Sequence, residues 1–270
     1  MLVSHVDIGE CSAVSTTVFH LGAQAIVSAA NRSPLATWES NVRGTYNLLE
    51  ACRAHSHVSD AVQRIVVASS DKAYGDHEDL PYREDLPLQP RYPYDVSKAA
   101  TDLIARSYWH SFRLPVAVTR FANLYGGGDL NRSRLIPEAV GAALAGRAPV
   151  IRSDGSPERD FLYVEDAVEA YLLLADALDG DDSAARGEAF NAGGGAPHAV
   201  RDVVARICAL AGTDVAPDIR GSGTPEGEID RQYVDASKLR ALTGWEPRVD
   251  LDEGLRRTLA WYREHPSALA

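Results

Sequence analysis

Short apolar runs alternate with longer segments of helical periodicity in the first half of the chain. The run RIVVA at 64–68 ends at Ser69, as expected for a strand that is buried on both faces of a parallel sheet. Similar runs predict strands at 17–21 and 115–119. Apolar positions at helical spacing predict helices at 34–54 and 94–112. This alternation predicts a doubly wound parallel sheet with helices on both faces.

The second half has a different pattern. Three glycines at 126–128 interrupt the chain, and helical periodicity then predicts helices at 135–146, 164–177, 200–211 and 251–262. A short strand is predicted at 150–151, and another ends at 190–191. We therefore expect a nucleotide-binding domain at 1–126. Residues 127–270 should form mainly a smaller α/β substrate lobe, with parts of 160–192 returning to the first sheet.

Composition excludes several classes of protein. The chain has 270 residues, of which 45% are hydrophobic, and a formal net charge of −11. An acidic chain without a basic stripe is not expected to bind nucleic acid or an anionic membrane. No stretch approaches the roughly 20 apolar residues of a membrane span. The cysteines Cys11, Cys52 and Cys208 have no metal-binding spacing, so we expect no metal site and a cytoplasmic location.

A tyrosine and a lysine open the predicted helix at 94–112. Tyr94 and Lys98 are four residues apart, which places them on one helical face. A nearby ammonium favours the phenolate form of a tyrosine, which can then remove a proton from a sugar hydroxyl. The pair alone is weak evidence, because a packed tyrosine and a solvated lysine often share this spacing.

Two serines end the predicted strand at 64–68. Ligands of open α/β sheets bind beyond the carboxyl ends of the strands, so Ser70 is expected to face the same crevice as Tyr94. Its hydroxyl could orient the substrate oxygen. A serine at this position could equally cap a turn.

Four longer motifs then occur in order: SSDKAYG at 69–75, PYDVSK at 93–98, RFANLYG at 120–126 and RDFLYVED at 159–166. Together with segments at 19–23, 41–45 and 237–245, they resemble the extended short-chain dehydrogenase/reductases that modify nucleotide sugars. The resemblance covers residues 17–262. It implies a Rossmann-like fold, NAD as cofactor, a nucleotide-diphosphate sugar as substrate, and a homodimer that pairs through the helices at 34–54 and 94–112.

The resemblance also implies a role for individual residues. Ser70, Tyr94 and Lys98 match the catalytic trio. The implied cofactor contacts are Leu21, Gly22, Ala23, Gln24, Asn41, Ala68, Ser69, Tyr94, Lys98 and Phe121. The implied substrate contacts are Ser70, Asn123, Arg159 and Arg231, of which the two arginines would bind the diphosphate.

Asp71 and Lys72 follow Ser70 directly and bear on the reaction type. A 4,6-dehydratase oxidises C4 and must then remove the C5 proton and help the C6 hydroxyl to leave. Many sugar dehydratases have Asp-Glu at these positions, and the CDP-glucose 4,6-dehydratases have Asp-Lys. The resemblance therefore implies an NAD-dependent 4,6-dehydratase acting on a CDP-glucose-like substrate. Asp71 would be the acid and desolvated Lys72 the base.

Other interpretations stay open. A 4-epimerase or reductase of the same family needs neither Asp71 nor Lys72, and these two residues could form a solvated pair in a turn. A non-catalytic remnant that binds nucleotide sugar belongs to another class altogether. No G-x-G-x-x-G lies between a predicted strand and helix. We therefore expect an N-terminally truncated sheet that binds NAD weakly.

Overall fold

The computed structural model describes residues 17–56, 62–180, 183–224 and 228–269, which form two compact units. The first unit contains Met1–Phe121, Glu169–Ala192 and Asp235–Trp245. The second contains Ala122–Val168, Gly193–Val234 and Glu246–Ala270. Cys11 lies outside the described residues, whereas Cys52 and Cys208 are buried free thiols.

The first unit is built on a four-stranded parallel sheet. Its strands are β1 (Thr17–His20), β2 (Arg64–Ala68), β3 (Val116–Phe121) and β7 (Ala189–Ala192), in that order. The β-branched residues of β2 and β3 suit a pleated strand that is buried on both faces. The four strands predicted for this unit are confirmed, although β3 extends two residues beyond its predicted end.

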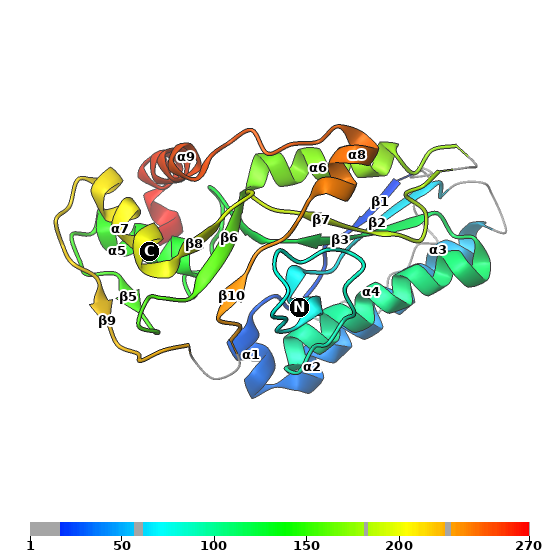
Figure 1. Cartoon of the computed structure of the whole chain (residues 1–270), viewed down its shortest axis with the longest axis horizontal. Coiled ribbons are helices and arrows are strands. Elements are labelled where there is room, and N and C mark those ends of the chain that lie inside the picture. Colours follow the sequence, from blue (N-terminus) through cyan, green and yellow to red (C-terminus); the bar gives the residue numbers. More distant parts are fainter. Residues whose placement is uncertain (1–16, 57–61, 181–182, 225–227, 270) are drawn as a thin grey trace. The chain divides into compact units, whose positions relative to one another are not determined.

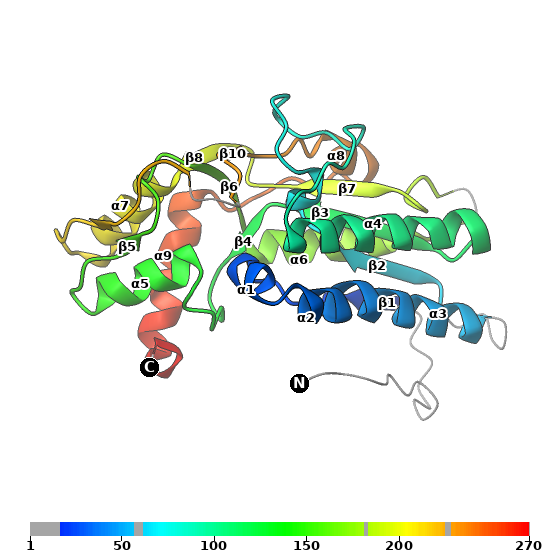
Figure 2. The ribbon, with the colours of Figure 1, turned by 90° about the horizontal axis from the view of Figure 1, so that it is seen from below.

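Helices cover both faces of this sheet (Figure 1). The helices α3 (Gly44–Ser56) and α4 (Pro93–Phe112) run side by side on one face (Figure 2). Leu49 of α3 and Ala105 of α4 pack against Ile65 and Val116 of the sheet. On the other face lie α8 (Ser237–Thr243) and the part of α6 (Val164–Asp176) that belongs to this unit. The chain is therefore an α/β protein with a Rossmann-like parallel sheet.

The helix predicted at 34–54 contains an irregular turn. It consists of α2 (Pro34–Trp38), the π-helical turn η2 (Glu39–Arg43) and α3, and a short helix α1 (Val27–Arg32) precedes it. A π turn widens the backbone and redirects its carbonyl groups, often at a functional site. Periodicity predicted the helical segment correctly but gave no sign of this turn, which contains Asn41.

The second unit packs three helices against short strands. Its main sheet contains β4 (Asn123–Tyr125), β6 (Glu158–Tyr163), β10 (Arg231–Gln232) and the antiparallel β8 (Pro197–Ala199). The strands β5 (Val150–Ile151) and β9 (Asp218–Ile219) form a separate pair. The helices α5 (Leu135–Leu144), α7 (Val200–Ala211) and α9 (Leu251–Glu264) bury Val140, Ile207 and Leu255 in one core. A last 3-10 turn, η4, spans Pro266–Leu269.

The predicted helices of this unit are confirmed, but most of its strands were not predicted. The strand β6 (ERDFLY) begins with charged residues, and β8, β9 and β10 have only two or three residues. Within the described residues, no helix is long and apolar enough to span a membrane.

Candidate functional site

The expected site residues of the first unit gather where parallel strands end. Leu21 follows β1, Ser69 follows β2 and Phe121 ends β3. The backbone N–H of Ser69 donates to Thr119 O at 2.9 Å, so the β2–β3 ladder continues to this edge. Ligands of open α/β sheets bind at such an edge.

Ser70 organises the first turn after β2. Its backbone is extended, and its hydroxyl oxygen accepts from the Lys72 N–H at 3.2 Å and thereby caps the 3-10 turn η3 (Asp71–Tyr74). The same hydroxyl donates to Asp71 Oδ1 at 3.0 Å. Asp71 is only 3% exposed and Lys72 only 9%. The turn thus keeps the side chains of Asp71 and Lys72 away from bulk water, with the Asp71 carboxyl group bound to the serine hydroxyl.

Tyr94 and Lys98 lie one turn apart at the start of α4, and both are buried. The Lys98 ammonium donates to Ala68 O at 2.8 Å, and Ser69 Oγ donates to Lys98 O at 2.9 Å. These two bonds tie the first turns of α4 to the end of β2. Burial lowers the pKa of Lys98 to about 8, because desolvation disfavours the ammonium.

Asn41, in the π turn, joins the turn after β1 to α4. Its side-chain amide accepts from Gln24 N at 2.7 Å, and its Nδ2 donates to Gln24 O at 3.0 Å and to Ser97 Oγ at 2.8 Å. The Asn41 carbonyl accepts from the hydroxyls of Thr45 and Thr101. Asn41 thus holds the Gln24 turn, where cofactor contacts are expected, against the helix that carries Tyr94.

His20 ends β1 close to this network. One of its ring nitrogens lies 3.0 Å from Thr45 Oγ1. Burial, and secondarily the positive charge of Lys98, lower the pKa of His20 to about 4. The imidazole is therefore neutral at physiological pH.

The other expected cofactor contacts differ in exposure. Leu21 is 54% exposed, and Gly22 and Ala23 continue the same turn. Phe121 is buried, with its ring centroid 4.9 Å from that of Tyr171. The apolar Phe121 ring and the exposed turn after β1 both lie at strand ends of the first unit.

The three expected substrate contacts Asn123, Arg159 and Arg231 belong to the second unit. Asn123 Nδ2 donates to Asp160 O at 3.1 Å. Both arginines have carboxylate partners: Arg159 Nη2 lies 3.3 Å from Glu228 Oε2, and Arg231 Nε lies 2.5 Å from Glu158 Oε2. Because the Arg231 pair is solvent-exposed, it is expected to be weak and exchangeable.

Sequence reasoning missed the hydroxyl groups that support the site. Thr45, Ser97 and Thr101 bind Asn41 from α3 and α4, yet nothing in their spacing distinguishes them from ordinary helix residues. In the part of the chain that the structure describes, no group of three or more His, Cys, Asp or Glu side chains could hold a metal ion.

The chain is similar to known nucleotide-sugar enzymes over most of its length. Residues 12–258 match the family model described as GDP-mannose 4,6 dehydratase. The chain is 32% identical to a dTDP-glucose 4,6-dehydratase of Haemophilus influenzae, covering 91% of this chain and 75% of that enzyme. It is 30% identical to a trifunctional UDP-glucose 4,6-dehydratase/UDP-4-keto-6-deoxy-D-glucose 3,5-epimerase/UDP-4-keto-L-rhamnose-reductase of Arabidopsis thaliana. That alignment covers 93% of this chain but only 36% of the plant enzyme.

A solved structure shares the fold. The dTDP-glucose 4,6-dehydratase of Bacillus anthracis, determined in complex with NAD, superposes with a TM-score of 0.78 at 29% identity. The match covers 93% of this chain and 74% of that chain.

We predict that Asn41→Ala lowers the free energy of unfolding by about 2 to 4 kcal/mol, because the buried Asn41 amide makes three hydrogen bonds, one of them to the fully buried Ser97 hydroxyl. Urea denaturation measures this change. The matched control is Asn47→Ala, at an exposed position of α3, which should stay within about 0.5 kcal/mol of the wild type. Equal effects of the two variants would mean that Asn41 is not a structural link.

We also predict a pH-dependent contribution of His20 to stability. The pKa of His20 is about 4 in the native state, below its ordinary value of 6.5. Between these two pH values, His20 is therefore protonated in the unfolded chain but not in the native state. The free energy of unfolding should therefore fall as the pH drops from 6.5 to 4. His20→Gln, which never ionises, should lose less stability over this range in urea titrations at successive pH values. Parallel curves for variant and wild type would contradict the prediction.

Proposed function

Because the chain belongs to the GDP-mannose 4,6-dehydratase family, we propose that it is an NAD-dependent nucleotide-sugar 4,6-dehydratase. The proposed reaction oxidises C4 of the sugar, eliminates water across C5 and C6, and returns hydrogen to C6. One observation carries the proposal. Asp71 and Lys72 are buried in a turn that begins directly at Ser70, in the same unit as Tyr94 and Lys98.

The first step of the proposed reaction is the oxidation at C4, in which Tyr94 would act as the base. Tyr94 Oη takes the proton of the C4 hydroxyl, and Ser70 Oγ hydrogen-bonds the same oxygen and orients it. Lys98 supports this step electrostatically, since a neighbouring ammonium stabilises a phenolate. The bonds from Lys98 to Ala68 and from Ser69 to Lys98 fix the position of the helix that carries both groups.

The residues of the first unit fit the nicotinamide end of NAD. Within the described residues, the Lys98 ammonium donates one hydrogen bond, to Ala68 O, which leaves two N–H groups for ribose hydroxyls. Gln24, held by Asn41, and the buried Phe121 would border the same ligand. When bound, NAD would take hydride from C4 and deliver it to C6.

The second step requires the pair in η3. After C4 becomes a ketone, the C5 proton is acidic. In the proposed roles, Lys72 Nζ removes that proton and Asp71 donates one to the departing C6 hydroxyl, which leaves as water. When hydride has reached C6, the Lys72 ammonium would return a proton to C5. Burial of Asp71 and Lys72 supports these roles, because water competes little for either group.

The substrate is proposed to be a nucleotide-diphosphate sugar, with a CDP-glucose-like compound favoured by the Asp-Lys pair at 71–72. Arg159, Arg231 and Asn123 would bind the diphosphate. For the arginines, phosphate oxygens would replace the carboxylates of Glu228 and Glu158.

The experiment is incubation of the chain with NAD and CDP-glucose, with UDP-glucose, dTDP-glucose and GDP-mannose in parallel. Formation of a 4-keto-6-deoxy sugar is expected, and Asp71→Asn should abolish it while C4 oxidation continues. Asp76→Asn, at an exposed position just beyond the same turn, is the matched control and should keep full activity.

The other outcomes of this experiment separate the alternatives. Inversion at C4 without loss of oxygen would identify an epimerase, and full dehydratase activity in Asp71→Asn would refute the role of the acid. Binding of nucleotide sugar without any turnover would favour a non-catalytic protein.

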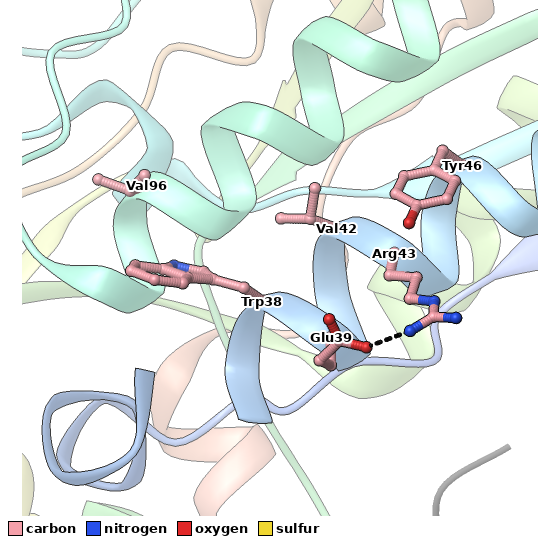
Figure 3. A pocket seen from close by; sticks show the side chains of 6 residues that line it. All are labelled: Trp38, Glu39, Val42, Arg43, Tyr46 and Val96. Atoms are coloured by element: carbon pink, nitrogen blue, oxygen red, sulfur yellow. Dashed lines mark hydrogen bonds and ion pairs between the residues drawn. The ribbon is translucent and has the colours of Figure 1, made fainter. Parts of the chain in front are cut away.

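We further propose a homodimer that forms through α2–α3 and α4. Trp38 and Tyr46 border a surface hollow of about 300 Å³ together with Val96 of α4 (Figure 3). Leu103, seven residues after Val96 and therefore on the same helical face, is 56% exposed. The Glu39–Arg43 ion pair lines the same hollow. Exposed aromatic and aliphatic side chains grouped on adjacent helices are typical of a protein interface, and a second copy would cover them.

We predict that Leu103→Glu yields a monomer, because a charge placed on this face would be desolvated in the dimer. Sedimentation velocity measures the oligomeric state. Leu130→Glu, the same substitution at an exposed leucine of the second unit, should remain a dimer. A wild-type monomer at high concentration, or a dimer that survives Leu103→Glu, would disprove this interface.

A further inference from the structure

A buried ion pair lies one helical turn after Lys98 on α4. Arg120 of β3 and Asp102 of α4 are 1% and 0% exposed. Two hydrogen bonds join them, from Arg120 Nε to Asp102 Oδ2 at 2.7 Å and from Nη2 to Oδ1 at 3.1 Å. Because Asp102 follows Lys98 by four residues on α4, the arginine is fixed relative to the catalytic helix.

The remaining guanidinium nitrogen binds the turn that carries Asp71 and Lys72. Arg120 Nη1 donates to Tyr74 Oη at 3.0 Å, and the guanidinium carbon lies 4.8 Å from the centre of the Tyr74 ring. Tyr74 is the last residue of η3 and is fully buried. Burial raises the pKa of Tyr74 to about 12, so its hydroxyl stays protonated and can donate.

The Tyr74 hydroxyl donates to Asn191 Oδ1 at 2.8 Å. Asn191 lies on β7, and its Nδ2 donates to Tyr82 O at 2.9 Å and to Asp235 O at 3.2 Å. Tyr74 is thus held on one side by the arginine bound to α4 and on the other by the sheet.

The buried pair Arg120–Asp102 is not explained by its contribution to stability alone. A buried ion pair contributes little net stability, because desolvation of the two charges offsets their attraction. Among the backbone bonds of the turn η3, Ala73 N–H donates to Ser70 O, Gly75 N–H donates to Lys72 O, and Tyr74 O accepts from Gln89 N–H. A single 3-10 turn is too short to fix two side chains by itself, whereas catalytic groups must be held within about 0.5 Å.

We propose that Tyr74, held by Arg120 and Asn191, is a positioning residue that fixes Asp71 and Lys72 relative to Tyr94 and Lys98. It thereby couples elimination of water to oxidation at C4. This inference rests on the proposed dehydratase function. The roles differ by step: Ser70, Tyr94 and Lys98 serve the oxidation, whereas the groups in η3 serve the elimination.

The test is Tyr74→Phe, which keeps the ring under the guanidinium and removes only the hydroxyl. Since a misplacement of about 1 Å can lower a rate about 100-fold, elimination should slow by about 10- to 100-fold. Oxidation at C4, followed in single turnovers by the absorbance of reduced nicotinamide, should change much less, and so should KM for the nucleotide sugar. The matched control is Tyr108→Phe, which removes a hydroxyl that binds Glu50 farther along α4 and should alter neither step.

Equal losses of oxidation and elimination in Tyr74→Phe would indicate a general structural role and overturn the proposal, as would an unchanged rate of elimination. A second measurement does not depend on activity. Hydrogen exchange of a peptide spanning 69–76 should accelerate in Tyr74→Phe and not in Tyr108→Phe, and unchanged exchange would overturn the proposal. If the wild type forms no 4-keto-6-deoxy product, the proposed function fails, and the exchange data still decide whether Tyr74 anchors the turn.

Discussion

The parallel pairing of β1, β2 and β3 is the constraint on which the site of the first unit depends. Paired residues such as Phe19 with Val66, and Val66 with Ala117, keep the three strands in step. Their carboxyl ends therefore reach one edge of the sheet together. A shift of one residue would turn each side chain of a strand to the opposite face and separate the residues that follow the strands.

Buried polar side chains then convert this edge into a rigid site. Asn41 links the turn after β1 to α4, and Lys98 links α4 to the end of β2. The pair Arg120–Asp102 links β3 to the same helix. A buried polar group that loses its partner costs about 1 to 3 kcal/mol. Each link therefore resists small displacements that an apolar contact would tolerate, as catalysis by closely spaced groups requires.

The two units supply different chemistry to the proposed reaction. In the proposal, the first contributes Tyr94, Asp71 and Lys98, which are all buried, and burial lowers the pKa of Lys98. The second carries arginines that already have carboxylate partners. A diphosphate has more charge than a single carboxylate and suits the planar guanidinium, so exchange of partners on substrate binding is physically reasonable. The acidic net charge of the whole chain does not prevent diphosphate binding, because the diphosphate would interact mainly with the nearby arginines.

The amino-acid sequence by itself determined the alternation of strands and helices in the first unit, since buried parallel strands and amphipathic helices have distinct periods. It also placed Ser70 after a strand and Tyr94 and Lys98 on one helical face. Only the tertiary structure decided that Asn41 lies in a π turn, that Asp71 and Lys72 are buried, and that Tyr74 binds Arg120 and Asn191. Those features depend on side chains from separate strands and helices, some more than 100 residues apart in the chain, and no local pattern encodes such contacts.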